Sequence, residues 1–462
     1  MTYRLMLCTA AALATPALAA SSGPEVKTGS GTVRGQSADG VTSFLGIPFA
    51  AAPVGALRWQ PPRPAPRWQG VRDAQAYAAD CMQKPFPSDA APLGTTPAED
   101  CLYLNVWKPA SAGRGPLPVL VWIYGGGFVN GGSSPPTYSG AALARQGIVV
   151  VSFNYRVGRF GTFRHPALTG EGASGNFGFM DQVAALRWVR ANVAAFGGDP
   201  AKVTIVGESA GGMSVHMLLT SPQAQGLFAS AVIQSGGDGH GMPTADAAHA
   251  EAASIAFARA HGVDGNDAAA AARLRALPAE EVVDGLNLAT MRPAGPPTFA
   301  SPYADGIVSV DAANAYAAGR FAHVPVMVGA TSNDIGGATG WMVQGARSVA
   351  ATLAGAGVPV YYYRFGYVAN ARRAEDNQGA PHASDIPYFF DTAAIKYGDA
   401  TTADDRRTSS TVSSYLVAFV KNGDPSSNGL PAWPRYSAAQ PVMMTFAPDA
   451  SAKAGVETPP TP

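Results

Sequence analysis

The chain has 462 residues, of which 47% are hydrophobic and 14% are charged, so it can bury a large core, and extensive disorder is not expected. Lysine plus arginine and aspartate plus glutamate each total 32, so the formal net charge is zero, and the charge balance does not point to a nucleic-acid partner or an anionic membrane surface. The 53 glycines and 38 prolines suit a loop-rich α/β fold better than a helical bundle.

Residues 1–19 have the pattern of a cleavable signal peptide. Arg4 supplies a positive charge, Leu5–Leu18 is apolar and rich in alanine, and Ala17-Leu18-Ala19 offers a small-x-small cleavage site. A membrane anchor would need a longer and more apolar run. A lipoprotein is disfavoured because Cys8 lies early and follows a bulky leucine. We therefore predict a secreted or periplasmic protein without stable membrane insertion.

Removal of this segment leaves two cysteines, Cys81 and Cys101. In an exported chain they allow one pairing, and a disulfide that closes the short loop between them is the default prediction. A free catalytic thiol is the less favoured alternative.

Strand and helix patterns alternate along the rest of the chain. The predicted strands are Val26–Gly35, Val41–Ile47, Leu102–Trp107, Pro118–Ile123, Ile148–Asn154, Val203–Val206, Phe228–Ser235, Val324–Ala330 and Val358–Phe365. The first two should form a small antiparallel hairpin. The third and fourth should be strands of the main sheet, and Pro118–Ile123 is continuously apolar, which is typical of a sheet covered on both faces.

Helical patterns lie between these strands. They cover Met180–Phe196, the residues after Gly211, the alanine-rich stretch 244–288 and Ser409–Val420, whereas the tail after Pro448 is polar and is expected to be loose. Buried strands alternating with helices predict an α/β fold with a mainly parallel sheet and helices on both faces. We expect one domain over residues 20–462, with a helical insertion around 244–288.

The stretch Gly207-Glu208-Ser209-Ala210-Gly211 lies between a predicted strand and a predicted helix. G-x-S-x-G in this setting is the nucleophile elbow, a strained turn that exposes a serine hydroxyl. The two glycines make the turn sterically possible, and the helix that follows points its free N–H groups at Ser209. The alternative is a glycine-rich turn that holds an ordinary serine.

A second glycine-rich stretch, Tyr124-Gly125-Gly126-Gly127-Phe128, follows the apolar strand Pro118–Ile123. Consecutive glycines let the backbone turn its N–H groups into a cavity, as an oxyanion hole requires. Glycine triplets also occur in plain loops, so this one gains its significance as a partner of the elbow.

A nucleophilic serine needs a base and an orienting acid, in the chain order Ser, Asp/Glu, His. Among the seven histidines, His382 follows the last predicted buried strand and fits the position of the base. The other six are His165, which precedes the serine, His216, interpreted as a packing residue of the elbow helix, His240, His249 and His261 in or near the alanine-rich region, and His323, which opens a strand. For the acid, Asp334 follows the strand Val324–Ala330, and Asp305 is the runner-up, which reads better as a turn aspartate.

Three blocks of the sequence resemble the type B carboxylesterase family, the α/β-hydrolases that include the cholinesterases. They are Glu99-Asp100-Cys101-Leu102-Tyr103-Leu104-Asn105-Val106, Phe196-Gly197-Gly198-Asp199-Pro200 through Gly211, and Trp122-Ile123-Tyr124-Gly125-Gly126-Gly127-Phe128. Fainter likeness extends from about Gly31 to Ser437, so it covers most of the mature chain. The resemblance implies the α/β-hydrolase fold.

This resemblance also implies roles for individual residues. Ser209 would be the nucleophile and His382 the base, and the oxyanion donors would be the N–H groups of Gly126, Gly127 and Ala210. A Cys81–Cys101 disulfide is implied as well. The family usually has glutamate as the acid, whereas the matching residue here is Asp334, whose side chain is one methylene shorter.

Two departures from the family pattern concern the pocket. The stretch from Asp334 to Tyr361 is short, because the family usually has a longer helical segment there, so we expect a more open pocket. The loop between Cys81 and Cys101 lacks the tryptophan that binds choline in cholinesterases, so a cation–π site for a quaternary ammonium group is not supported.

The leading hypothesis is therefore a secreted serine carboxylesterase that acts on a small-molecule ester through an acyl-enzyme. We expect no cofactor, no metal ion and no nucleic-acid partner. A non-catalytic binding or adhesion protein on the same fold is disfavoured because nucleophile and base are both present. A lipase with interfacial activation is the third hypothesis, and it would need a mobile amphipathic lid, which the sequence does not reveal.

Overall fold

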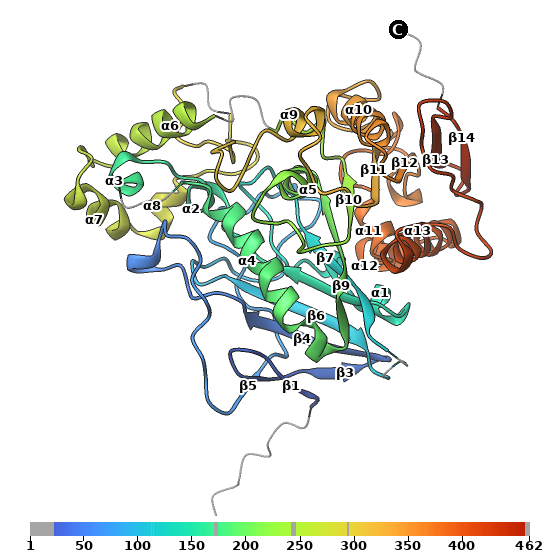
Figure 1. The fold of residues 1–462 in the computed structure, drawn as a ribbon, viewed down its shortest axis with the longest axis horizontal. Coiled ribbons are helices and arrows are strands. Elements are labelled where there is room, and N and C mark those ends of the chain that lie inside the picture. Colours follow the sequence, from blue (N-terminus) through green and yellow to red (C-terminus); the bar gives the residue numbers. More distant parts are fainter. Residues whose placement is uncertain are drawn as a thin grey trace, which may run out of the picture.

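The computed structural model describes residues 23–111, 113, 115–170, 174–241, 246–292 and 295–457, so the predicted signal peptide lies outside the described residues. One eleven-stranded sheet runs through the described chain in the order β14-β13-β12-β11-β10-β9-β7-β8-β6-β4-β3 (Figure 1). Its strands are β3 Gln36–Ala38, β4 Val41–Pro48, β6 Tyr103–Pro109, β7 Leu117–Ile123, β8 Val149–Phe153, β9 Gly198–Glu208, β10 Ser230–Gln234, β11 Val326–Thr331, β12 Val360–Phe365, β13 Val442–Phe446 and β14 Ala452–Val456. The mainly parallel sheet is confirmed, because every pairing from β8 to β13 is parallel and antiparallel pairs occur only at the two edges.

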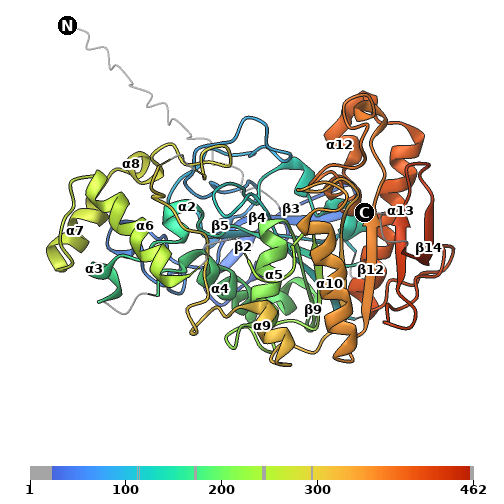
Figure 2. The same cartoon turned by 90° about the horizontal axis from the view of Figure 1, so that it is seen from above.

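Helices cover both faces of this sheet, and the inner strands β8, β10, β11 and β12 are buried at every position. The helices α4 Phe177–Asn192, α5 Ala210–Thr220 and α10 Trp341–Gly355 pack on one face (Figure 2), and α1 Ala141–Arg145 and α13 Ala403–Asn422 pack on the other (Figure 1). The shorter helices are α2 Gly158–Gly161, α3 Pro166–Thr169, α9 Ala312–Ala317, α11 Ile386–Phe389 and α12 Ala393–Tyr397. This double covering explains the continuous apolar runs in the sequence.

The N-terminal strands form two hairpins instead of one. Strands β1 Glu25–Lys27 and β2 Thr32–Arg34 pair antiparallel, and β5 Val71–Asp73 extends them in parallel to a three-stranded sheet. The predicted pairing of Val26–Gly35 with Val41–Ile47 is wrong, because β4 pairs with β3 and β6. The cause lies in Asp39-Gly40, whose positive φ angles of 50° and 75° make the tight two-residue turn that joins β3 to β4.

The alanine-rich stretch forms three helices, α6 Ala247–Ala260, α7 Ala268–Ala276 and α8 Ala279–Val283. Asp246 and Asp267 cap the first two, since each carboxylate accepts a hydrogen bond from the backbone in the first turn. These helices lie at one end of the molecule (Figure 1) and share a second hydrophobic cluster with Trp59 and Phe163.

Two predictions about the C-terminal part need correction. Helix α13 begins at Ala403 instead of Ser409, because Thr402 and Asp405 form a reciprocal capping box. The tail after Pro448 is not loose throughout, since β14 pairs with β13 through its backbone, which needs no apolar side chains. In the part of the chain that the structure describes, no helix is long and apolar enough to cross a membrane.

Candidate active site

Ser209 occupies a strained turn between β9 and α5. Its φ and ψ are 56° and −122°, a conformation that a non-glycine residue seldom adopts. A Cβ atom on Gly207 would come within 2.3 Å of the Gly211 carbonyl oxygen, and one on Gly211 within 2.0 Å of the Ile123 carbonyl oxygen. Both glycines are therefore required by the close approach of neighbouring backbone, and the Ser209 side chain stands at the start of α5.

The structure brings His382 and Asp334 to this serine. His382 Nε2 lies 2.9 Å from Ser209 Oγ, and His382 Nδ1 lies 2.6 Å from Asp334 Oδ1. Asp334 follows β11 and His382 follows β12, and the two loops are joined because the Asn333 N–H donates to the Ala380 carbonyl at 2.9 Å. Parallel pairing of β11 with β12 thus places residues that are far apart in sequence at one edge of the sheet.

Asp334 accepts five hydrogen bonds, which keep its carboxylate charged. Oδ2 accepts from the Ser235 hydroxyl at 2.6 Å and from the N–H and hydroxyl of Thr331 at 3.1 and 2.8 Å. Oδ1 accepts from the Ile335 N–H at 2.7 Å in addition to His382. Burial opposes the charged form, but these hydrogen bonds and the positive charge of His382 outweigh it and lower the pKa of Asp334 to about 2.

Glu208, the residue before the serine, also faces the histidine. It is 2% exposed, and its Oε1 lies 3.3 Å from His382 Nε2. Burial raises the pKa of Glu208 well above its usual range. Burial of His382 disfavours the imidazolium, but the charges of Glu208 and Asp334 stabilise it and raise the pKa of His382 to about 9. The cluster therefore keeps a proton to a higher pH than a free histidine would.

The glycine triplet after β7 lies against the elbow. A Cβ on Gly125 would come within 2.9 Å of the Ser209 Cβ. Gly126 and Gly127 have φ angles of 103° and 62° and line the same cavity as Ser209. Among the described residues, no protein acceptor pairs with the N–H groups of Gly126 and Gly127. Ala210 is the first residue of α5, so its N–H has no partner within the helix.

A cavity of about 550 Å³ opens in front of Ser209. Its wall is mostly apolar and includes Phe86, Tyr138, Met213, Leu288, Met291, Ile335, Trp341, Met342 and Ile386, with Asp89 and Arg292 as charged members. The short stretch after Asp334 contains α10, which contributes Trp341 and Met342 to this wall. Ile335 and Trp341 are 45% and 37% exposed, so the cavity has an apolar rim.

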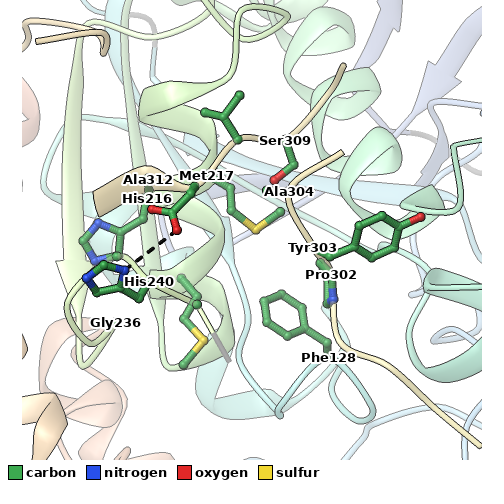
Figure 3. A pocket seen from close by; sticks show the side chains of 15 residues that line it. Phe128, His216, Met217, Gly236, His240, Pro302, Tyr303, Ala304, Ser309 and Ala312 are labelled. Atoms are coloured by element: carbon green, nitrogen blue, oxygen red, sulfur yellow. Dashed lines mark ion pairs between the residues drawn. The ribbon is translucent and has the colours of Figure 1, made fainter. Parts of the chain in front are cut away.

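A second, smaller pocket of about 50 Å³ lies beside α5 and is lined by His216, His240 and Tyr303 (Figure 3). His216 Nδ1 lies 2.8 Å from the Tyr316 hydroxyl, and burial lowers the pKa of His216 to about 4. His216 is thus a buried, neutral packing residue, as predicted. Neither histidine lines the cavity that contains Ser209.

The structure also places the other residues weighed in the sequence. Asp305 closes a turn, since its Oδ1 accepts hydrogen bonds from the N–H groups of Ile307, Val308 and Ser309 at 2.9 to 3.0 Å. Its carboxylate does not contact His382. The predicted disulfide between Cys81 and Cys101 is present.

Sequence reasoning missed two carboxylates near the base. Glu208 directly precedes Ser209 in the G-x-S-x-G motif, and this position could have indicated a carboxylate close to the nucleophile. Asp385 lies three residues after His382 and is fully buried, and burial raises its pKa to about 7. Its Oδ2 lies 3.4 Å from the Tyr363 hydroxyl, and no sequence pattern indicates that contact.

Comparisons with known proteins agree with this geometry. The chain matches the carboxylesterase family over residues 22–345 and 338–459. It is 33% identical to the fumonisin B1 esterase of Sphingopyxis macrogoltabida, with 94% of this chain and 88% of that protein covered. It is 49% identical to the para-nitrobenzyl esterase of Bacillus subtilis, but over only 46% of this chain and 43% of that one. A solved PNB esterase structure superposes with a TM-score of 0.81 at 29% identity and covers 94% of this chain and 97% of its own. The chain therefore belongs to the carboxylesterase family, has the α/β-hydrolase fold and is a carboxylic ester hydrolase.

Proposed function

We propose that this hydrolase works through a Ser209–His382–Asp334 triad. Ser209 Oγ attacks the ester carbonyl carbon while His382 Nε2 takes the hydroxyl proton, and Asp334 holds the imidazole in the tautomer that leaves Nε2 free to accept it. When the tetrahedral intermediate collapses, His382 returns the proton to the departing alcohol. Water then attacks the acyl-enzyme with the same base, which releases the carboxylic acid and regenerates Ser209.

The negative charge on the tetrahedral oxygen would be held by the N–H groups of Gly126, Gly127 and Ala210. All three belong to residues that line the cavity beside Ser209, and the N-terminal end of α5 adds its positive dipole at the same point. Fixed backbone donors need no reorganisation during the reaction, which is why such donors contribute strongly to the rate.

One observation carries this proposal: the continuous pair of contacts, 2.9 Å and 2.6 Å long, that links Ser209 through His382 to Asp334 at the floor of the cavity. Substrate size follows from the cavity, whose volume of about 550 Å³ and apolar wall suit an ester with a sizeable apolar group. We place Trp341 and Ile335 at the rim as the surface that this group meets first.

We further propose that residues 20–462 form a single exported catalytic domain after removal of residues 1–19. The Cys81–Cys101 disulfide supports export, because such bonds persist in oxidising compartments. Amino-terminal sequencing of the protein recovered outside the cytoplasm should begin at residue 20, and an intact Met1 would contradict export by cleavage.

The test of the mechanism is covalent labelling. A fluorophosphonate should modify the wild-type protein once, at Ser209, and abolish hydrolysis of p-nitrophenyl butyrate. Ser209→Ala should be neither labelled nor active while it keeps the wild-type melting temperature. Label on another residue, or turnover in Ser209→Ala, would contradict the assignment of the nucleophile.

A further inference from the structure

Side chains from outside the sheet hold the loop that carries the proposed oxyanion donors through hydrogen bonds. We propose that Gln83 is a positioning residue for hydrolysis, because it fixes the loop Gly125–Gly131 so that the N–H groups of Gly126 and Gly127 point at the oxyanion. This inference rests on the proposed function and deepens it. It gives the short segment around Cys81 a role in the rate of the reaction.

Gln83 pairs with Gly131 in the manner of a neighbouring strand. Its side-chain Nε2 donates to the Gly131 carbonyl at 2.7 Å, and the Gly131 N–H donates to Gln83 Oε1 at 2.9 Å. Oε1 also accepts from Asn130 Nδ2 at 3.1 Å, and Nε2 also donates to the Cys81 carbonyl at 2.9 Å. The side chain of Gln83 is buried, with 6% exposure, so water cannot easily replace these four bonds.

The loop residues that Gln83 bonds, Asn130 and Gly131, are in direct contact with the glycines of the donor turn. The Asn130 N–H donates to the Gly126 carbonyl at 2.9 Å. A Cβ on Gly126 would lie 2.3 Å from the Asn130 carbonyl oxygen, and one on Gly131 would lie 2.6 Å from the Gly125 carbonyl oxygen. The two halves of the loop therefore have no free space between them, and a displacement of Gly131 must move Gly126.

The loop also needs support from outside, because its backbone is strained. Phe128 has a φ of 62°, which is costly for a residue with a bulky side chain, and it follows two glycines that also have positive φ angles. Such a conformation persists only where the surrounding structure fixes it. Oxyanion donors act at separations of about 2.7–3.1 Å, so a shift of a few tenths of an ångström is enough to weaken them.

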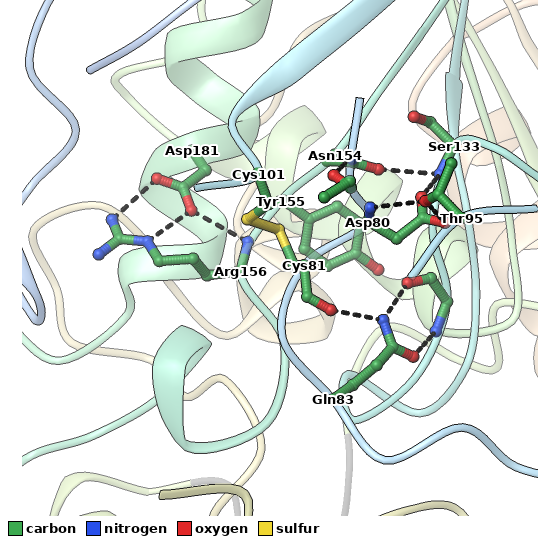
Figure 4. Close-up of a disulfide and its surroundings, with 12 residues drawn as sticks. Asp80, Cys81, Gln83, Thr95, Cys101, Ser133, Asn154, Tyr155, Arg156 and Asp181 are labelled. Carbon is green, nitrogen blue, oxygen red and sulfur yellow. Dashed lines mark hydrogen bonds and ion pairs between the residues drawn. A yellow bond between two sulfur atoms is a disulfide. The ribbon is translucent and has the colours of Figure 1, made fainter. Parts of the chain in front are cut away.

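Asp80, on the other side of Cys81, forms a second set of hydrogen bonds, which holds the residues that follow this loop. Its Oδ1 accepts hydrogen bonds from the N–H groups of Ser133 and Ser134 at 3.0 and 3.3 Å, and its Oδ2 accepts from the hydroxyls of Ser134 and Thr95 (Figure 4). The disulfide joins Cys81 to Cys101, which lies just before β6. The disulfide thus ties the segment that carries Asp80 and Gln83 to the start of β6, a strand that is paired on both sides with β4 and β8, so the segment resists displacement.

The experiment compares Gln83→Leu with Gln75→Leu. Leucine removes all four hydrogen bonds of Gln83 at similar volume. Gln75 is a matched control, because its amide also holds a backbone carbonyl, but that carbonyl belongs to Gly35, at 3.1 Å, and not to the loop Gly125–Gly131. For each variant we would measure kcat and KM with p-nitrophenyl butyrate, the inhibition constant of an aryl trifluoromethyl ketone, and the melting temperature. The ketone adds to the serine and forms an oxyanion, so its affinity reports on the donors.

We expect Gln83→Leu to lose kcat by roughly 10- to 100-fold, less than the ~10²–10³ for outright removal of a donor, with KM within about threefold. Affinity for the ketone should fall by the same factor as kcat. Gln75→Leu should keep the wild-type kcat even if it melts earlier. Asn130→Asp loses its donations to Gln83 Oε1 and to the Lys84 carbonyl but can still accept from the Leu288 N–H. It should show the same pattern more weakly, and it decides the matter if Gln83→Leu does not fold.

Wild-type kcat in a folded Gln83→Leu or, failing that, in Asn130→Asp would overturn the proposal, as would a loss confined to KM or an equal loss in Gln75→Leu. Ser209→Ala measured in the same assay separates the two levels of inference. Turnover in Ser209→Ala would reject the serine mechanism itself. Loss of turnover in Ser209→Ala, together with full activity in Gln83→Leu, would reject only the positioning role of Gln83.

Discussion

Replacing Asp334 by asparagine tests the acid most directly, because the structure dictates how the new side chain must sit. The aspartate receives three donors on Oδ2 and two on Oδ1. Asparagine has one carbonyl oxygen and one NH₂ group. The orientation that leaves fewer donors unpaired puts the oxygen at the Oδ2 position, toward Ser235 and Thr331, and the NH₂ group toward the Ile335 N–H and His382.

In that orientation the NH₂ group of the introduced asparagine can only donate to His382 Nδ1. The imidazole must then carry its proton on Nε2, and it can no longer accept the proton of Ser209. The serine-protease change of this kind lowers kcat about 10⁴-fold. We expect a loss on the order of 10²–10⁴ here, because the carboxylate of Glu208, 3.3 Å from His382 Nε2, can still stabilise the imidazolium that forms when Ser209 gives up its proton. The unpaired Ile335 N–H adds a stability cost of about 1–3 kcal/mol.

Steady-state kinetics on p-nitrophenyl butyrate and thermal melting separate these effects, and Asp305→Asn is the matched control. That variant weakens the turn that Asp305 closes, so it should melt earlier and keep its kcat. The reasoning fails if Asp305→Asn loses turnover at an unchanged melting temperature, or if Asp334→Asn stays within tenfold of wild type.

Three further predictions follow from the site and the disulfide. Because the pKa of His382 is raised to about 9, the neutral base forms only as the pH rises, so the acid limb of kcat/KM should lie above the ordinary histidine value of about 6.5. Glu208→Gln should move that limb to lower pH by roughly 1–2 units. This shift is within the ~5 kcal/mol that Coulomb's law allows for two charges 3.3 Å apart at an effective dielectric constant of ~20. An unmoved limb in a pH–rate profile would refute the coupling between Glu208 and His382. Trp341→Ala should raise KM for aryl esters several-fold and leave KM for ethyl butyrate nearly unchanged, and equal effects on both would remove Trp341 from the substrate path. Thiol titration of the denatured, unreduced mature protein should find no free thiol, whereas two thiols would mean that Cys81 and Cys101 are reduced in the purified protein.

The residues closest to the proposed chemistry could be predicted from the sequence because their constraints are local. Gly207 and Gly211 are required by contacts within one turn, and the continuous apolar strand before the glycine triplet indicates a covered sheet. The order of serine, acid and histidine along the chain is a property of the fold, so Asp334 and His382 could be selected before any distance was known.

Contacts between residues far apart in sequence were decided only by the tertiary structure. The Glu208–His382 contact depends on the loop after β12 returning to the end of β9, and the hold of Gln83 on Gly131 depends on the path of the disulfide loop. Neither leaves a periodic or compositional pattern, because a single buried side chain supplies each contact. The pairing of β14 with β13 could not be predicted from the sequence for a related reason. Its hydrogen bonds join backbone atoms, which are the same in nearly every residue.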